Sequence, residues 1–215
     1  MTRVRESYDA MADRYVELFS DELAQARPER GLIDCLAAEA APLGGPVADL
    51  GCGPGHAARY LADKGIPAIG IDLSPRMIER ARERHPGLDL RVGTMTALEL
   101  SDGALAGALA IYSLIHLPLE GRALAYRELG RVIRSGGWLL VSFHISAPDQ
   151  PEGSSVTLTD WQGVAVDLPG NYLARAEVSA GLEGAGFEER ARLERGPWSP
   201  DEVPSRRCYL LMQKR

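Results

Sequence analysis

The sequence predicts a doubly wound α/β domain that spans residues 1–215. Two observations support this class: short apolar segments alternate with helical segments along the chain, and a glycine-rich turn joins the first such pair. The composition agrees, since 45% of the 215 residues are hydrophobic. A chain of this length and composition can bury one sizeable core, so a single domain with appendages is expected.

The first strand and helix lie within residues 46–65. Residues 46–50 are apolar and predict a buried strand, and helical spacing follows from His56 onward. The intervening glycines, Gly51, Gly53 and Gly55, therefore occupy a strand-to-helix turn. Glycine at these positions allows close approach of the backbone to a ligand, because no Cβ intervenes.

The remaining elements follow the same alternation. Ser74 and Pro75 are typical of a helix start, and Gly136 with Gly137 predicts the end of a later helix. Further strands are predicted at residues 67–71, 88–93, 105–113, 138–145, 188–195 and 206–214, and further helices at 74–85, 120–133 and 172–187.

Two segments fall outside this rhythm. Residues 1–42 predict two N-terminal helices, the first amphipathic, with Tyr8, Met11, Ala12, Tyr15, Leu18 and Phe19 on one face. The first helix either packs on the sheet or forms a lid over a ligand. Residues 146–171 are rich in Pro, Gly, Ser and Asp and predict an inserted cover over the substrate, with a short hairpin at 156–158 and 164–166.

Charge and cysteine usage exclude several classes of function. The formal net charge of −6 provides no broad basic surface, so nucleic acid is not an expected partner. The scattered cysteines, Cys35, Cys52 and Cys208, favour neither a disulfide framework nor a metal site. No apolar run approaches the ~20 residues of a membrane span, and the first residues are too polar for a signal peptide. We expect a cytoplasmic monomer or homodimer.

The spacing of the glycines distinguishes two classes of cofactor. A dinucleotide site favours GxGxxG, whereas His56 stands where the third glycine of that pattern would lie. Asp49, Gly51, Gly53 and Gly55 form DxGxGxG instead. Asp72 ends the second predicted strand, where a carboxylate can accept both hydroxyls of a ribose.

At this point the sequence resembles the class I S-adenosylmethionine-dependent methyltransferases, especially the small-molecule group with the DLGCGPG motif. The segments VADLGCGPG, IGIDLS, VIRSGGWLLVSF and LEGAGF carry this resemblance together. It implies a Rossmann-like seven-stranded sheet in the order 3-2-1-4-5-7-6, with the last strand antiparallel. It also implies S-adenosylmethionine as cofactor and S-adenosylhomocysteine as product.

The resemblance assigns roles to particular residues. Asp49 with the backbone of Gly51 and Gly53 would hold the methionine portion, and Asp72 the ribose. The adenine pocket would include Leu73 and Met77. The family usually places an acidic residue after the third strand, where this chain has Thr94 and Met95. The other expected cofactor-site residues are Tyr8, Tyr15, Cys52, Gly55, Tyr112 and Ser113.

Two histidines are candidate general bases. His116 follows the fourth predicted strand and His144 closes the fifth, so both are expected near the transferred methyl group. The alternative for each is a loop histidine with hydrogen bonds to the backbone. The rings of Tyr8, Tyr15 and Tyr112 are candidates to face the sulfonium. His85 is expected at the surface, and no metal site is predicted.

The leading hypothesis is methyl transfer to a small-molecule acceptor by in-line displacement. The second hypothesis is a protein that binds the cofactor without turnover, favoured by the altered residues after the third strand. The third is a nicotinamide-dependent oxidoreductase, against which His56 argues. Nothing in the sequence decides whether the acceptor atom is oxygen, nitrogen, sulfur or carbon.

Overall fold

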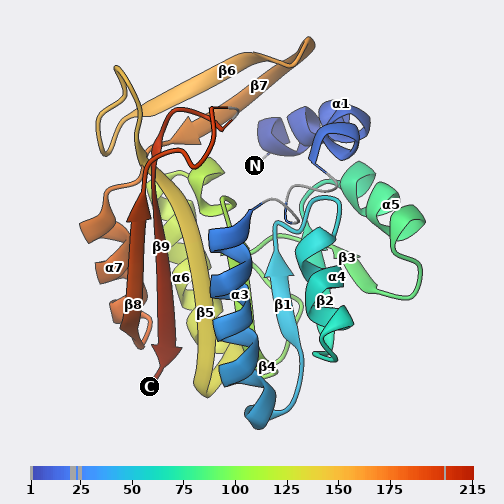
Figure 1. The fold of residues 1–215 in the computed structure, drawn as a ribbon, viewed down its shortest axis with the longest axis vertical. Coiled ribbons are helices and arrows are strands. Elements are labelled where there is room, and N and C mark those ends of the chain that lie inside the picture. Colours follow the sequence, from blue (N-terminus) through green and yellow to red (C-terminus); the bar gives the residue numbers. More distant parts are fainter. Residues whose placement is uncertain (1, 20–22, 24–25, 201) are drawn as a thin grey trace.

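A computed structural model describes residues 2–19, 23, 26–200 and 202–215. They form an α/β domain with a seven-stranded sheet and a separate two-stranded hairpin (Figure 1). The strands of the large sheet, in spatial order, are β3 (Asp89–Val92), β2 (Ala68–Asp72), β1 (Val47–Leu50), β4 (Leu105–Ile111), β5 (Ile133–Ser146), β9 (Arg206–Lys214) and β8 (Phe187–Arg195).

The strand directions confirm the predicted topology. Strands β1 to β5 pair in parallel, and β9 pairs antiparallel with both of its neighbours, β5 and β8. Without the hairpin strands in the count, this is the order 3-2-1-4-5-7-6 with an antiparallel last strand. The strand order reverses between β1 and β4, which is where sheets of this kind bind ligands at the carboxyl ends of their strands.

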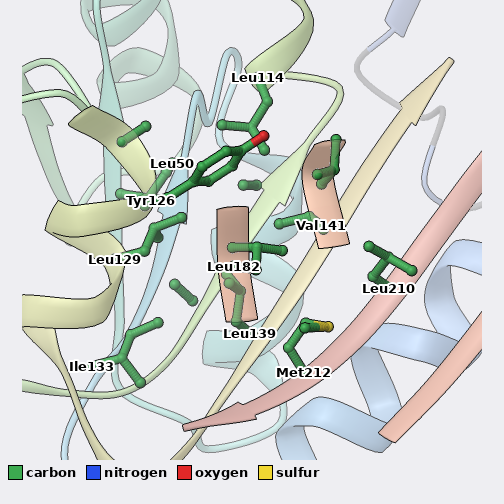
Figure 2. Close-up of a cluster of buried hydrophobic side chains, with 14 of the residues drawn as sticks. Leu50, Leu114, Tyr126, Leu129, Ile133, Leu139, Val141, Leu182, Leu210 and Met212 are labelled. Atoms are coloured by element: carbon green, nitrogen blue, oxygen red, sulfur yellow. The ribbon is translucent and has the colours of Figure 1, made fainter. Parts of the chain in front are cut away.

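Helices cover both faces of the sheet. Helices α3 (Arg27–Ala40), α4 (His56–Asp63) and α5 (Pro75–Arg84) pack on one face, and α6 (Leu119–Val132) and α7 (Arg175–Gly184) on the other. Adjacent residues of one strand serve the two layers: Leu140 packs with the α3 layer, and Leu139 with the α6 layer. Figure 2 shows Leu129 of α6 among the buried side chains on the face of the sheet that carries Leu139.

The chain passes from α6 to β5 without a loop, which corrects one prediction. The helix ends at Val132, and Ile133 already pairs with Leu105 of β4, whereas the sequence predicts a helix that continues to residue 133 and stops at the glycines. Gly137 lies inside the strand. A Cβ there would stand 2.9 Å from the carbonyl oxygens of Ala106 and Arg134, so glycine permits the close approach of these strands.

Two segments cover the end of the sheet toward which β1 points (Figure 1). They are α1 (Thr2–Phe19) and the hairpin of β6 (Ser155–Trp161) and β7 (Val164–Asn171), whose strands are longer than predicted. Met11 and Ala12 of α1 are buried as expected, but Leu18 is 42% exposed. Leu168 of β7 packs in the same cluster, so the helix and the hairpin form one cover.

The described ranges contain neither a candidate membrane-spanning helix nor a cluster of metal-ligating side chains. None of their helices has both the length and the hydropathy of a membrane span. Within the same ranges, no three His, Cys, Asp or Glu side chains come together as metal ligands would.

Candidate functional site

A cavity of about 330 Å³ lies between the carboxyl ends of the central strands and the cover formed by α1 and the hairpin. Its volume falls in the range of about 300–1,000 Å³ typical of small-molecule sites. Both candidate histidines line it, as do most of the predicted cofactor-site residues. The latter are Tyr8, Tyr15, Asp49, Gly51, Cys52, Gly53, Asp72, Leu73, Thr94, Met95, Tyr112 and Ser113.

The glycine turn lies against the segment that follows β4. Gly51, Gly53 and Gly55 all have positive φ, at 80°, 50° and 81°. A Cβ on Gly51 would stand 2.6 Å from the Cβ of Ser113. Glycine is therefore required at position 51 both for its conformation and for the close approach of two chain segments.

Asp49 is a buried carboxyl group on the cavity wall. The Asp49 residue is only 3% exposed. Burial is the main cause that raises the pKa of Asp49 to about 7; the hydrogen bond from the backbone N–H of Ala58 opposes this shift, and the nearby charge of Asp72 adds to it. A cationic ligand group beside Asp49 would stabilise its ionised form.

Asp72 connects the glycine turn to the start of α5. Its Oδ2 accepts a hydrogen bond from the Gly53 N–H at 2.9 Å, and its Oδ1 accepts one from the Ser74 N–H at 2.8 Å. Burial raises the pKa of this carboxyl group, and these N–H groups oppose that shift. Each oxygen retains acceptor capacity, so the carboxylate can still receive the hydroxyls of a ribose.

The segment after β3 provides a further part of the wall. Thr94 and Met95 line the cavity beside Gly93. The Thr94 hydroxyl lies 2.8 Å from that of Thr96 and accepts a hydrogen bond from the Thr96 N–H at 3.3 Å. The hydroxyl of Thr94 thus already has partners within its own turn, and Met95 adds an apolar surface.

Tyr112 and Ser113 follow β4 directly. Tyr112 has a φ of 51°, which is unusual for a residue other than glycine and commonly marks a functional position. Its ring stacks on that of His144, with centroids 4.9 Å apart. The Ser113 hydroxyl oxygen is buried and has no hydrogen-bond partner in the described part of the chain, so a ligand in the cavity would supply one.

Two tyrosines of α1, Tyr8 and Tyr15, line the cavity on the side of the cover. The Tyr8 hydroxyl lies 2.8 Å from Nε2 of His116, and the Tyr15 ring stacks on Trp161 of the hairpin at 5.5 Å. Burial, together with the charge of Asp72, raises the pKa of Tyr8. Asp9 attaches the same helix to α5 by accepting a hydrogen bond from the Ser74 hydroxyl at 2.6 Å.

Both ring nitrogens of His116 have partners. Nδ1 lies 2.7 Å from the carbonyl oxygen of Pro169 in β7. A carbonyl oxygen only accepts, so Nδ1 carries the proton and Nε2 accepts from Tyr8. Burial lowers the pKa of His116, which favours this neutral form. The residue therefore connects α1, the segment after β4, and the hairpin.

His144 lies at the end of β5. Its Nδ1 is 2.7 Å from the Ser205 hydroxyl. Burial lowers its pKa to about 4, and the positive charges of Arg207 and Arg195 contribute to the shift. The imidazole is therefore neutral around pH 7, and it lines the cavity beside Tyr112.

Two predicted site residues do not line the cavity. Gly55 caps the start of α4 and approaches His85, and Met77 is fully buried beneath α1. His85 is also more enclosed than expected, because its Nε2 is buried. Neighbouring His56 does line the cavity, and burial lowers its pKa to about 4.

The sequence reasoning missed Glu29, which lines the cavity from the first turn of α3 and is 6% exposed. The signal was present in the sequence. Glu29 precedes Ile33 by four residues and Leu36 by seven, so it occupies the apolar face of its helix. An acidic residue in that position indicates a specific partner.

These features define a doubly wound protein with a nucleotide-type cofactor site: a glycine turn after β1, an acidic residue at the end of β2, and a cavity at the switch point. Residues 47–137 match the family described as methyltransferase domain. This match supports the resemblance of the chain to the class I S-adenosylmethionine-dependent methyltransferases.

Curated relatives agree with this family. One is a probable S-adenosylmethionine-dependent methyltransferase of Mycolicibacterium smegmatis, 30% identical over 67% of this chain and 52% of the relative. Another is sarcosine/dimethylglycine N-methyltransferase of Halorhodospira halochloris, 31% identical over 66% of this chain and 53% of the relative. The chain thus spans about half the length of these relatives.

Solved structures share the fold. A putative methyltransferase of Haloferax volcanii, solved in complex with the Trm112 methyltransferase activator, has a TM-score of 0.72 and 20% identity. The match covers 98% of this chain and 96% of that one. A methyltransferase of Methanosarcina mazei gives a TM-score of 0.68 at 20% identity, over 79% of this chain and 92% of that one.

Proposed function

We propose that this chain transfers the methyl group of S-adenosylmethionine to a small-molecule acceptor. The observation that carries the proposal is the shared cavity, which brings together Asp49, Asp72 and the residues after β4 and β5 beneath the cover of α1 and the hairpin. An enclosed site of this kind favours a small acceptor over a macromolecule. The net charge of −6 also disfavours nucleic acid.

Asp49, Asp72 and Ser113 are suited to hold the cofactor. Asp72 already accepts N–H bonds from the glycine turn and can accept the ribose hydroxyls in addition. Asp49 would hold the methionine ammonium, whose positive charge offsets the burial of the carboxylate. Ser113 would place its unpartnered hydroxyl against the same end of the cofactor.

The chemistry asks little of the protein beyond positioning. When bound, S-adenosylmethionine supplies a methyl group on a sulfonium, which is already electrophilic. Holding an acceptor atom in line with that methyl group can supply about 7–11 kcal/mol. The aromatic rings of Tyr8 and Tyr112 line the cavity and would favour the cationic centre.

His144 is the better-placed of the two candidate bases. It is neutral at pH 7 because its pKa is lowered to about 4, so it can accept a hydrogen bond from the acceptor group. His116 has both ring nitrogens engaged and is better suited to positioning the cover. A second function, cofactor binding without turnover, would require neither role.

The relatives named above differ in substrate, and one of them acts on sarcosine and dimethylglycine by its name. Another relative, from Renibacterium salmoninarum, is a demethylmenaquinone methyltransferase. Their names describe small acceptors, which supports the class of acceptor proposed here but not its identity.

Calorimetric titration with S-adenosylhomocysteine tests the cofactor site. We expect micromolar binding that Asp72→Ala weakens at least tenfold, no binding of NADH, and no change in Asp102→Ala, whose side chain is 81% exposed. Absence of binding to the unsubstituted protein would contradict the proposal. Binding without transfer of labelled methyl groups to a panel of amines, phenols, thiols and carboxylic acids would favour the function without turnover.

A further inference from the structure

Glu29 is a buried acid that the cofactor site does not use. It lies at the start of α3, on the side of the cavity formed by β4, β5 and β9. The residues proposed for the ribose and adenine follow β2 and β3, toward the opposite edge of the sheet. Because the strand order is β3-β2-β1-β4-β5-β9, the two groups lie at opposite ends of the cavity.

One oxygen of Glu29 is fully engaged. Its Oε1 accepts hydrogen bonds from the Tyr209 hydroxyl and from Nη2 of Arg195 at 2.6 Å, with the Tyr112 hydroxyl at 3.5 Å. The Tyr112 hydroxyl also lies 2.6 Å from that of Tyr209. These contacts fix the carboxylate against the cavity wall.

The charge of Glu29 is already balanced. Arg195 pairs with Glu29 and also with Glu202 at 2.6 Å, and Arg207 lies 2.8 Å from the same Glu202. Two glutamates therefore face two arginines. A further full negative charge at this end of the cavity would meet the carboxylate of Glu29, so an anionic ligand group is disfavoured.

The second oxygen of Glu29, Oε2, is buried and receives no hydrogen bond from any residue that the structure describes, although Glu29 lines the cavity. Burial removes the water around a carboxylate oxygen, and without a donor no hydrogen bond offsets the cost of that desolvation. Tyr112 and His144, whose rings stack on each other, also line the cavity, and the Tyr112 hydroxyl lies 3.5 Å from Oε1 of Glu29.

We infer that Glu29, Tyr112 and His144 form the binding site of the methyl acceptor, and that the acceptor presents an O–H or N–H group to the free oxygen of Glu29. The substrate class is therefore a hydroxyl or amine compound with a planar or apolar body, and a carboxylate at this end is disfavoured. This inference rests on the proposed function, because it assumes that the other end of the cavity holds the cofactor.

Matched fragments test the inference. Phenol and aniline carry the required donor, whereas anisole and N,N-dimethylaniline have the same rings without it. We expect phenol and aniline to bind the protein loaded with S-adenosylhomocysteine at least tenfold more tightly than their methylated counterparts, as measured by NMR titration, and benzoate to bind more weakly than phenol. Equal affinities, or no binding of any fragment, would overturn the inference.

Glu29→Gln replaces the free acceptor with an amide that can donate. We expect the preference for phenol over anisole to disappear in this variant, while Glu202→Gln, which perturbs the same ion pairs away from the cavity, retains it. Glu29→Asp is the substitute variant if Glu29→Gln fails to fold. It keeps the charge but withdraws the carboxylate by one methylene, so phenol binding should weaken. An unchanged preference in folded Glu29 variants would contradict the assignment.

The methionine ammonium of the cofactor is a second possible donor for Oε2. Titration with S-adenosylhomocysteine and with methylthioadenosine, which lacks the amino-acid group, separates the two sources. We expect Glu29→Gln to leave both affinities within twofold. A selective loss for S-adenosylhomocysteine would assign Glu29 to the cofactor and overturn the inference. If the unsubstituted protein binds neither ligand, the proposed function fails, and the fragment comparison on the free protein still tests Glu29.

Discussion

At the residue scale, the cavity depends on groups whose placement costs stability. Asp49 is a buried carboxyl group, Ser113 has an unpartnered hydroxyl, and Tyr112 adopts a positive φ. Each is unfavourable without a ligand, and their concentration in one place is typical of a binding site. Substitutions at these positions are therefore expected to separate stability from function.

Asp49→Asn should stabilise the cofactor-free protein. The folded pKa of about 7 lies above the unfolded value of about 3.9, so ionisation of Asp49 opposes folding increasingly as the pH rises from about 4 to about 7. The gain in melting temperature should be larger at pH 8 than at pH 5, as measured by calorimetry. An equal or smaller gain at pH 8 would show that folding does not raise the pKa of Asp49.

The same group predicts how cofactor affinity depends on pH. A methionine ammonium binds the ionised form of Asp49, so affinity for S-adenosylhomocysteine should increase between pH 6 and pH 8 and level off above the pKa of about 7. Asp49→Asn should bind more weakly and lose this dependence. Calorimetric titration at several pH values checks both points, and a pH-independent affinity in the unsubstituted protein would exclude the role of Asp49.

Gly51→Ala should abolish cofactor binding and destabilise the fold. The substitution forces a Cβ to within 2.6 Å of Ser113 at a φ of 80°. Gly65→Ala is the matched control, since Gly65 has a φ of 79° and no atom within 4 Å of the added Cβ. We expect about 1 kcal/mol of destabilisation from the control and more from Gly51→Ala, measured by chemical denaturation. Similar losses would show that conformation alone explains the glycine.

At the element scale, the cover is attached through a few specific contacts. Tyr8 of α1 and Pro169 of β7 bind opposite nitrogens of His116, and Asp9 binds the start of α5. The exposed pair of Arg3 and Asp167 adds a direct connection between the helix and the hairpin. The cover is therefore held both by contacts with His116, which lines the cavity, and by contacts at the protein surface.

Tyr8→Phe should loosen the cover without unfolding the domain. It removes one buried hydrogen bond, whose net value of about 0.5–1.5 kcal/mol corresponds to roughly a 2–12-fold effect. We expect S-adenosylhomocysteine to dissociate faster by a factor in this range, measured by stopped-flow fluorescence. Arg3→Ala removes a pair that is 61% and 53% exposed and should change the rate by less than twofold. Equal rates for Tyr8→Phe and the unsubstituted protein would rule out a fastening role.

At the scale of the whole molecule, stability comes from the two helical layers on the sheet. Leu129 of α6 is fully buried among side chains of the sheet (Figure 2), whereas Leu124 of the same helix is 40% exposed. Leu129→Ala should cost about 2–5 kcal/mol of unfolding free energy, and Leu124→Ala much less. Urea denaturation checks this, and similar losses would mean that the α6 layer is not tightly packed.

The sequence predicted the large-scale arrangement because its signals are local or belong to the family. The alternation of strands and helices, the glycine turn and Asp72 are all readable in short segments, and the resemblance supplied the strand order. The start of β5 at Ile133 was missed because the glycines that follow resemble a helix end. Gly137 instead permits the close approach of β4 and β5, and Gly136 adopts a positive φ of 78° within the strand.

The candidate site was predicted less completely, since it depends on contacts between distant segments. His116 and Tyr8 are 108 residues apart, and no local pattern indicates that they share a hydrogen bond. Met77 was assigned to the cavity from its place after Asp72, but α1 covers it. Glu29 was overlooked although its position on an apolar helical face was visible in the sequence.

The antiparallel strand β9 has a consequence for the order in which the protein matures. It lies between β5 and β8, and its Tyr209 binds Glu29, a residue 180 positions earlier. A growing chain that has not yet synthesised residues 206–214 lacks this strand, and β8 has no neighbour with which to pair. The end of the cavity near Glu29 is therefore assembled only after residues 206–214 have been synthesised, and contacts so distant in sequence favour slow folding.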